Sequence, residues 1–326
     1  MAPESPHQHR PPRQPRLEAF QVVFVMLGLV VLPAALTLQT VHPPGRLEIT
    51  SANPTPLGYT ISLALFVVPV SALLWWLCRR RDLGLQRRAC VRTLAVLVPL
   101  GLVLDIVFGN AFFTFPNSAA TLGIGLPAVG GAIPLEEFLF YLSGFGVVLL
   151  TYVWADEYWM AAYNIPDYTA ATAEMPRLVQ FHWPSLACGA GLLVIALLYK
   201  KLWSPVPTGF PWYVIYLIVA AFVPSTGFFR TAQPFINWRA FSFTCFFIVL
   251  VSLLWEATLA IPYGWWGYRA AAMLGLTIGA WSQLPVEAVG VWLTVSFTTV
   301  IGYEVVKLWL ATGKRALEAF FGIQRP

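Results

Sequence analysis

The stretch that decides the fold class is IPLEEFLFYLSGFGVVLLTYVW, residues 133–154. After the two glutamates near its start it has no charged side chain, and at 1.5 Å per residue it can cross the roughly 30 Å hydrocarbon core of a bilayer. In lipid, a single segment satisfies its backbone hydrogen bonds as a helix. We therefore predict a transmembrane helix that begins with two acidic residues.

The rest of the chain has the same character. Of its 326 residues, 58% are hydrophobic and 11% are charged. Because soluble proteins average about 25% charged residues, this composition excludes a soluble enzyme. We expect an all-α membrane bundle of about eight transmembrane helices, near 18–40, 57–78, 91–111, 133–154, 182–202, 210–229, 240–260 and 284–309. Two shorter apolar stretches, 118–132 and 267–283, are candidates for re-entrant segments, so seven or nine spans remain alternatives.

Positive charge falls mainly on one side of this arrangement. With the N-terminus inside, 16 of the 20 Lys and Arg residues lie on inner tails and loops, six of them between Arg79 and Arg92. Cytoplasmic loops are enriched in Lys and Arg. We therefore expect a multi-pass protein of the cell (inner) membrane with both termini in the cytoplasm. Its arginine cluster is expected to contact anionic lipid headgroups, and no nucleic-acid partner is expected.

The two halves of the sequence match at an offset of 151 residues. Glu136 falls on Glu287, and Tyr152 falls on Tyr303. Each half has four predicted spans, and an even number gives the halves the same orientation, related by an axis along the membrane normal. The predicted organisation is a disordered basic tail (1–17), a first membrane repeat (18–157), a cytoplasmic linker (158–180), a second repeat (181–310) and a cytoplasmic tail (311–326).

Acidic residues are scarce, so their depth in the predicted spans is informative. Five of the 15 are expected to gather at the outer end of the bundle: Asp105, Glu136, Glu137, Glu256 and Glu287. An ionised carboxylate at membrane depth costs about 2.5–3.5 kcal/mol on insertion scales, so such residues are functional candidates. A sixth, Glu304, precedes Lys307 by three residues near the inner end and is interpreted as half of a structural ion pair.

Two prolines precede the glutamates of the repeated motif. Pro134 and Pro285 are predicted to start their helices, where a missing N–H group costs nothing. The helix dipole favours an acidic residue in the same turn. Compensation of that dipole is the simplest reading of a single glutamate, but two adjacent glutamates, Glu136 and Glu137, with a matching one in the second half, favour a functional site.

The state of the acidic cluster depends on its hydration. A dry cluster would keep at least one carboxyl group protonated as a general acid, whereas a wet, ionised cluster would suit a cation. Aromatic rings surround it: Phe112, Phe115, Phe138, Phe140, Tyr141, Trp255, Trp266 and Trp292. They fit an interfacial belt, or a cavity that stabilises a carbocation by about 0.5–2 kcal/mol per ring. Together with the acids, they favour proton-initiated isoprenoid chemistry.

The sequence contains PLEEF at 134–138 and LPVEAV at 284–289, together with the upstream acids and aromatic loops. Through these features it resembles the integral-membrane, flavin-independent lycopene cyclase family. The resemblance covers about 105–157 and 256–310. It implies a cofactor-independent isomerase (an intramolecular lyase) of carotenoid biosynthesis. A carboxylic acid protonates the terminal double bond of a membrane-embedded polyene, a six-membered ring closes, and a base removes a proton.

Carried onto this sequence, the resemblance implies Glu136 and Glu137 as acid and base, and Glu287 as the corresponding acid of the second half. Because Ala288 replaces the second glutamate there, whether both halves are catalytic stays open. Association with other carotenoid-pathway enzymes is also expected. No metal is expected, since the Cys and His residues lack metal-ligand spacing.

Two functions of other classes also fit the sequence. Repeats with buried acids describe a proton-coupled secondary transporter. A non-catalytic protein that binds a carotenoid or lipid is a third interpretation. We favour chemistry because the acids gather at one end and do not form a chain across the membrane.

Overall fold

The computed structural model describes residues 55–80, 86–164, 175–279 and 281–323, together with Gly28 and Thr172. These residues include seven helical segments long and apolar enough to cross a membrane. Some of the segments change from α- to π-helix along their length. They are α2 (Gly58–Arg79), α3 (Arg87–Phe112), α4 (Glu136–Trp154) with η2 (Ala155–Trp159), α6 (Trp183–Leu202), α7 (Trp212–Leu217) with η4 (Ile218–Phe222) and α8 (Val223–Ala232), α9 (Trp238–Trp255) with η5 (Glu256–Ala260), and α10 (Glu287–Thr312).

The predicted helical bundle is confirmed, whereas the predicted number of spans is not. Each of these seven segments coincides with one predicted span. The remaining prediction, 18–40, lies outside the described residues apart from Gly28. Helix α3 begins at Arg87, four residues before its predicted start, so the arginines at 87, 88 and 92 lie within the helix. The count of eight therefore stays a prediction.

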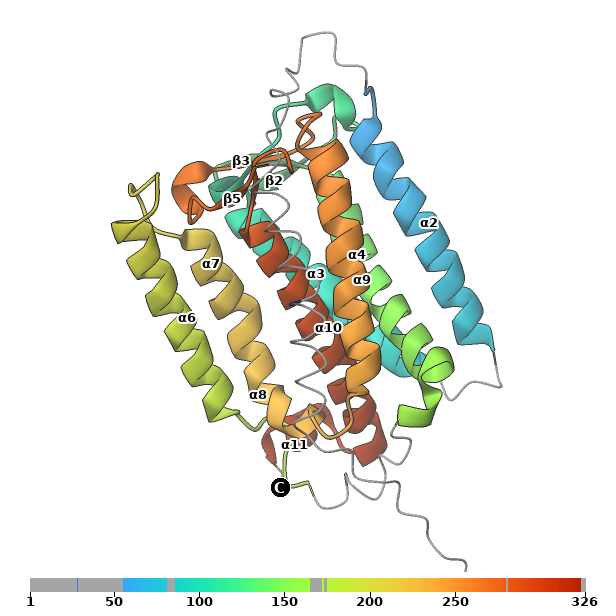
Figure 1. The fold of residues 1–326 in the computed structure, drawn as a ribbon. Coiled ribbons are helices and arrows are strands. Elements are labelled where there is room, and N and C mark those ends of the chain that lie inside the picture. Colours follow the sequence, from blue (N-terminus) through green and yellow to red (C-terminus); the bar gives the residue numbers. More distant parts are fainter. Residues whose placement is uncertain are drawn as a thin grey trace, which may run out of the picture.

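The helices run alongside one another between two different ends (Figure 1). We call one the hairpin end, because the short strands lie there, and the other the arginine end, where α2 finishes, α3 begins and α11 (Ala316–Phe321) lies. Helix α10 occupies the centre and packs against α3, α4, α8 and α9. Helices α2 and α6 are peripheral, and large apolar side chains such as Leu65 (71% exposed) face outward, as expected where lipid covers the bundle.

Three two-stranded antiparallel sheets at the hairpin end were not foreseen in the all-α prediction. They pair β1 (Phe113–Thr114) with β4 (Gly267–Tyr268), β2 (Gly125–Ala128) with β3 (Gly131–Pro134), and β5 (Thr277–Ile278) with β6 (Leu284–Pro285). The described residues of the short apolar stretches 118–132 and 267–283 form 3₁₀ turns and strands, and their re-entry into the membrane stays a prediction. Gly130 and Gly131 explain the first hairpin, because their φ angles of 83° and 148° suit a tight turn that other residues resist.

The prolines of the repeated motif lie outside the helices that they were predicted to start. Pro134 ends β3 and Pro285 ends β6, each two residues before the first helical residue. The next residue in each half donates its backbone N–H back to the loop, Leu135 to Ile124 and Val286 to Leu276. The glutamates themselves do occupy the first turns of α4 and α10, as predicted.

Candidate active-site cavity

A cavity of about 130 Å³ lies inside the bundle toward the hairpin end. This volume exceeds that needed for several water molecules. Its wall is mainly apolar and aromatic, and no Lys, Arg or His is among the described residues that line it. The polar or acidic side chains on the wall are Tyr59, Asp105, Glu137, Tyr141, Tyr213, Tyr216, Glu256, Trp266, Tyr268, Trp292, Thr294 and Thr298.

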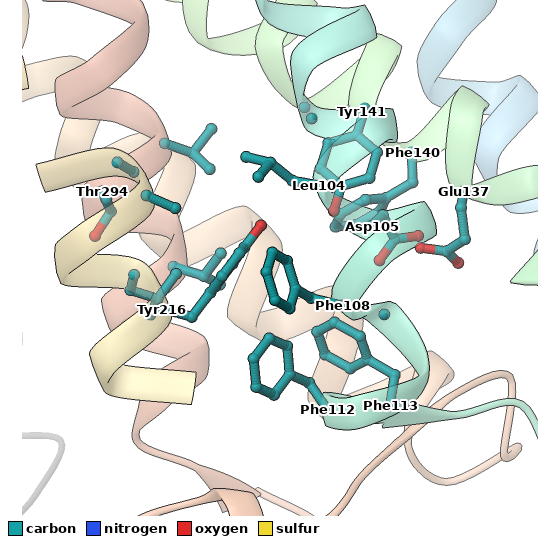
Figure 2. A pocket seen from close by; sticks show the side chains of 18 of the residues that line it. Leu104, Asp105, Phe108, Phe112, Phe113, Glu137, Phe140, Tyr141, Tyr216 and Thr294 are labelled. Atoms are coloured by element: carbon teal, nitrogen blue, oxygen red, sulfur yellow. The ribbon is translucent and has the colours of Figure 1, made fainter. Parts of the chain in front are cut away.

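Asp105 reaches the cavity from α3. Its side chain is buried, and its Oδ2 atom has no hydrogen-bond partner among the described residues. Gly109, one turn further along α3, makes room for the carboxyl group, because a Cβ atom there would lie 2.6 Å from Asp105 Oδ1. Figure 2 shows the carboxyl groups of Asp105 and Glu137 facing one another, with Tyr141 beside them. We call these two acids the carboxyl pair.

Glu137 is positioned by α2. It lies in the first turn of α4, and the Tyr59 hydroxyl donates a hydrogen bond of 2.8 Å to its Oε1 atom. Tyr59 is fully buried and packs on Trp265 and Trp266, with ring centroids 6.0 and 5.2 Å away. The aromatic cluster therefore fixes the tyrosine that orients the acid.

Glu256 enters from the second half of the chain with both carboxyl oxygens bonded. Trp292 Nε1 donates to Oε1 at 2.6 Å, and the Tyr268 hydroxyl bonds to Oε2 at 2.7 Å. Burial, and then the charge of Glu256, raise the pKa of Tyr268 well above its usual value, so its hydroxyl stays protonated and can donate. Two donors stabilise an ionised carboxylate. Glu256 also begins the π-helical turn η5, a feature frequent at functional sites.

Glu136 and Glu287 do not line the cavity, although both were predicted to be catalytic. Glu136 Oε1 accepts hydrogen bonds from Leu122 N at 2.7 Å and from the Thr60 hydroxyl. Glu287 Oε1 accepts one from Leu274 N. Each glutamate thus ties the loop before its hairpin to the start of its helix, which is a structural position next to the cavity.

Most of the predicted aromatic residues lie on the cavity wall. Phe112, Phe115, Phe140, Tyr141, Trp266 and Trp292 are there, and the Phe140 ring is 5.6 Å from each of Trp266 and Trp292. Trp255 lines a smaller neighbouring cavity of about 40 Å³. Phe138 is 36% exposed and lines neither cavity.

The sequence-based site omitted three tyrosines that the fold brings to the wall. Tyr59 bonds to Glu137, while Tyr213 and Tyr216 close the wall from α7. Tyr213 and Tyr216 could have been assigned to the site from their spacing, because residues three apart lie on one face of a helix. Each lies near a predicted membrane boundary, where an aromatic residue is normally assigned to the interfacial belt.

Residues from both halves of the chain therefore meet in one cavity: Asp105 and Glu137 from the first, Glu256 and Trp292 from the second. Chemically, this site offers paired acids, a separately hydrogen-bonded carboxylate and aromatic faces in an apolar enclosure. Comparisons with protein-family models, with curated proteins and with solved structures found no match for this chain.

Proposed function

We propose that this protein is a membrane-embedded isomerase that cyclises the end of a linear, uncharged polyene of the lycopene type by acid–base catalysis. The observation that carries the proposal is the placement of Asp105, Glu137 and Glu256 on one aromatic wall that no described Lys, Arg or His lines. Buried carboxyl groups without a cation are costly and mark functional sites. An apolar cavity also suits a hydrocarbon substrate.

The carboxyl pair is the proposed proton donor. Two facing carboxyl groups in an apolar wall do not both ionise readily, because each charge disfavours the other and burial disfavours both. Asp105 and Glu137 therefore hold at least one proton between them. The hydrogen bond from Tyr59 to Glu137 keeps the pair directed at the cavity.

Glu256 is the proposed base. Its two hydrogen bonds, from Trp292 and Tyr268, offset part of the cost of burying the carboxylate that such a role requires. The rings of Phe140, Trp266 and Trp292 supply π faces to the cation formed between the two proton transfers.

The proposed reaction is balanced. The carboxyl pair gives a proton to the terminal double bond, which forms a C–H bond and a carbocation. A second double bond of the chain attacks that cation, and the new C–C bond closes the ring. Glu256 then removes a proton next to the ring cation, and a double bond is restored. Return of that proton to the carboxyl pair restores the starting state of the protein. Because no electron or atom is gained or lost, the product is an isomer of the substrate.

The transporter interpretation is weaker because, in the part of the chain that the structure describes, the acids do not continue across the bundle. Glu304 lies 17 residues beyond Glu287 on α10, about 25 Å away along a helix, and forms an ion pair with Lys307 of 2.8 Å. The predicted structural ion pair is thereby confirmed. The intervening part of α10 supplies no further carboxyl group to the cavity.

We also infer the duplicated, two-half architecture. Its support is the matching bond of Glu136 to Leu122 and of Glu287 to Leu274, and the pairing of β1 with β4 across the two halves. With the arginine end in the cytoplasm, the cavity lies in the opposite half of the membrane. The arginine cluster there, in which Arg79 stacks on Trp75 at 3.8 Å, is the proposed contact for anionic lipid headgroups.

Expression in a host that accumulates lycopene, followed by pigment chromatography, tests the function. We expect cyclic products from the unaltered chain and a loss of about 100-fold or more with Glu137→Gln, the contribution of a general acid. Glu136→Gln is the matched control, because its amide oxygen can still accept the bonds from Leu122 and Thr60. Unchanged lycopene with abundant, monodisperse protein would refute the proposal for this substrate.

A further inference from the structure

The cavity reaches the surface of the bundle formed by the described residues, between α3 and the helix formed by α7 and η4. Leu100 and Phe108 of α3 line it, yet they are 48% and 41% exposed. On the opposite side the wall is made by Ala220 and Ala221 of η4, which are partly exposed. Side chains that are both cavity wall and outer surface mark an opening.

The opening lies at the depth of the hydrocarbon core. Leu100 is near the middle of α3, and Ala221 is near the middle of the segment Trp212–Ala232. The neighbouring outward side chains are apolar, with Val103 54% exposed and Val219 56% exposed. In a bilayer this opening would face acyl chains instead of water.

Aromatic rings close the same gap nearer the hairpin end. The ring centroid of Phe108 is 5.6 Å from that of Tyr216. The ring centroid of Phe112 is 5.0 Å from that of Tyr213 and 5.1 Å from that of Tyr216 (Figure 2). A ligand entering beside Leu100 would meet the Asp105 level about 7.5 Å further along α3. The acids are therefore reached from the lipid side beneath a layer of rings.

Local helix geometry favours a gap at this position. Small side chains at Ala220 and Ala221 occupy the π-helical turn η4, where the helix is locally widened and followed by Pro224. Thr298 of α10 forms part of the floor and bonds to Ser225 at 3.0 Å. Its hydroxyl is thus satisfied within the protein, which leaves a largely apolar passage.

We propose that this opening is a lateral portal through which one end of a long, uncharged, linear chain enters from the bilayer while the rest of the chain stays in lipid. The reacting end would lie at the carboxyl pair, and the portal would hold the adjoining stretch between Leu100 and Ala221. An anionic end group is disfavoured by three carboxyl groups on a wall that no described Lys, Arg or His lines. The identity of the entering chain rests on the proposed function, whereas the geometry of the portal does not.

Paired substitutions on the same helix test the portal. In Leu100→Trp the new ring enlarges a side chain on the wall, whereas in Val103→Trp it adds the same ring to an exposed position that does not line the cavity. Ala221→Phe and Val219→Phe form a second pair on η4. Each variant is purified into nanodiscs that contain lycopene, and the retained lycopene and the cyclic product are both measured. The melting temperature of each variant is recorded as a control for folding.

We expect about a tenfold loss of retained lycopene and of initial rate in Leu100→Trp and Ala221→Phe, and less than about a twofold loss in the two controls, because only the first pair fills the passage. Equal behaviour within each pair, in active protein, would overturn the portal and leave the function intact. Retained lycopene that depends on Leu100, without any cyclic product, would support the portal and overturn the function.

Discussion

Buried carboxyl groups lie at both ends of the bundle, but their surroundings differ. At the hairpin end, Asp105 and Glu137 face one another on one side of an apolar cavity. At the arginine end, Glu304 is bonded by Lys307 at 2.8 Å and by the Tyr152 hydroxyl at 2.9 Å. Both clusters are withdrawn from solvent, yet a cation neutralises Glu304 directly.

The network at the arginine end continues through Asn237, whose side chain donates to Asp156 at 2.9 Å and whose backbone N–H donates to the Tyr152 hydroxyl at 3.2 Å. Lys307 also interacts electrostatically with Asp156. Satisfied networks of this kind join helices and specify one packing. The comparison teaches that a buried acid indicates chemistry when it lines a cavity without a neutralising cation, and indicates architecture when its bonds tie parts of the fold together.

The largest expected effect tests the structural role of the paired cluster. Lys307→Met should lower the free energy of unfolding by about 3 kcal/mol, because Glu304 would lose its ammonium partner inside the protein. Thermal unfolding in detergent measures the loss. Turnover per folded molecule should stay within about twofold of the unaltered protein, since the cavity is not touched. A selective loss of turnover with unchanged stability would move Lys307 into the active site.

A smaller effect tests how Glu137 is oriented. Tyr59→Phe removes the hydroxyl that donates to Glu137 Oε1, and we expect about a tenfold lower rate from the loss of about 1.4 kcal/mol. The phenyl ring keeps the contacts with Trp265 and Trp266, so the melting temperature should change little. Product formation and melting curves are measured together. An unchanged rate would show that Tyr59 does not position the acid.

Removing an acid that has no neutralising cation should change the free energy of unfolding in the opposite direction from removing Lys307. Glu137→Met in a Tyr59→Phe background, which leaves no buried hydroxyl unpaired, is expected to stabilise the fold by about 1 kcal/mol relative to Tyr59→Phe while abolishing cyclisation, since an apolar side chain avoids the free-energy cost of burying a carboxyl group. The unfolding midpoint measures stability, and pigment chromatography of the same variant measures cyclisation. Clear destabilisation would mean that Glu137, like Glu304, holds the fold together.

The smallest effect is a pH dependence near the hairpin end. Because burial raises the pKa of Tyr268 above its usual value of 10.0, its contribution to stability is complete below about pH 10 and is lost as the pH rises further. Melting temperatures from pH 7 to 11 should therefore be flat and then fall, with a shallower fall in Tyr268→Phe. Identical slopes in the two proteins would contradict this assignment.

The helical bundle could be predicted from the sequence because lipid immersion leaves few ways to satisfy a backbone. The helices that carry the site followed from long apolar runs, and the first-turn position of Glu136 and Glu137 followed from the motif. The strands at 125–128, 131–134, 277–278 and 284–285 did not, because short apolar stretches are equally compatible with helix and strand. The pairing of Phe113 with Tyr268 also joins residues far apart in the chain.

By itself, the sequence determined that this chain forms apolar helices and that five scarce acids gather toward one end. It did not determine what each acid faces. Glu136 and Glu137 are neighbours, but adjacent residues on a helix point about 100° apart, so one bonds a loop and the other lines the cavity. Only the tertiary structure made that choice, because the direction of a side chain gains its chemical meaning from the helices that pack around it.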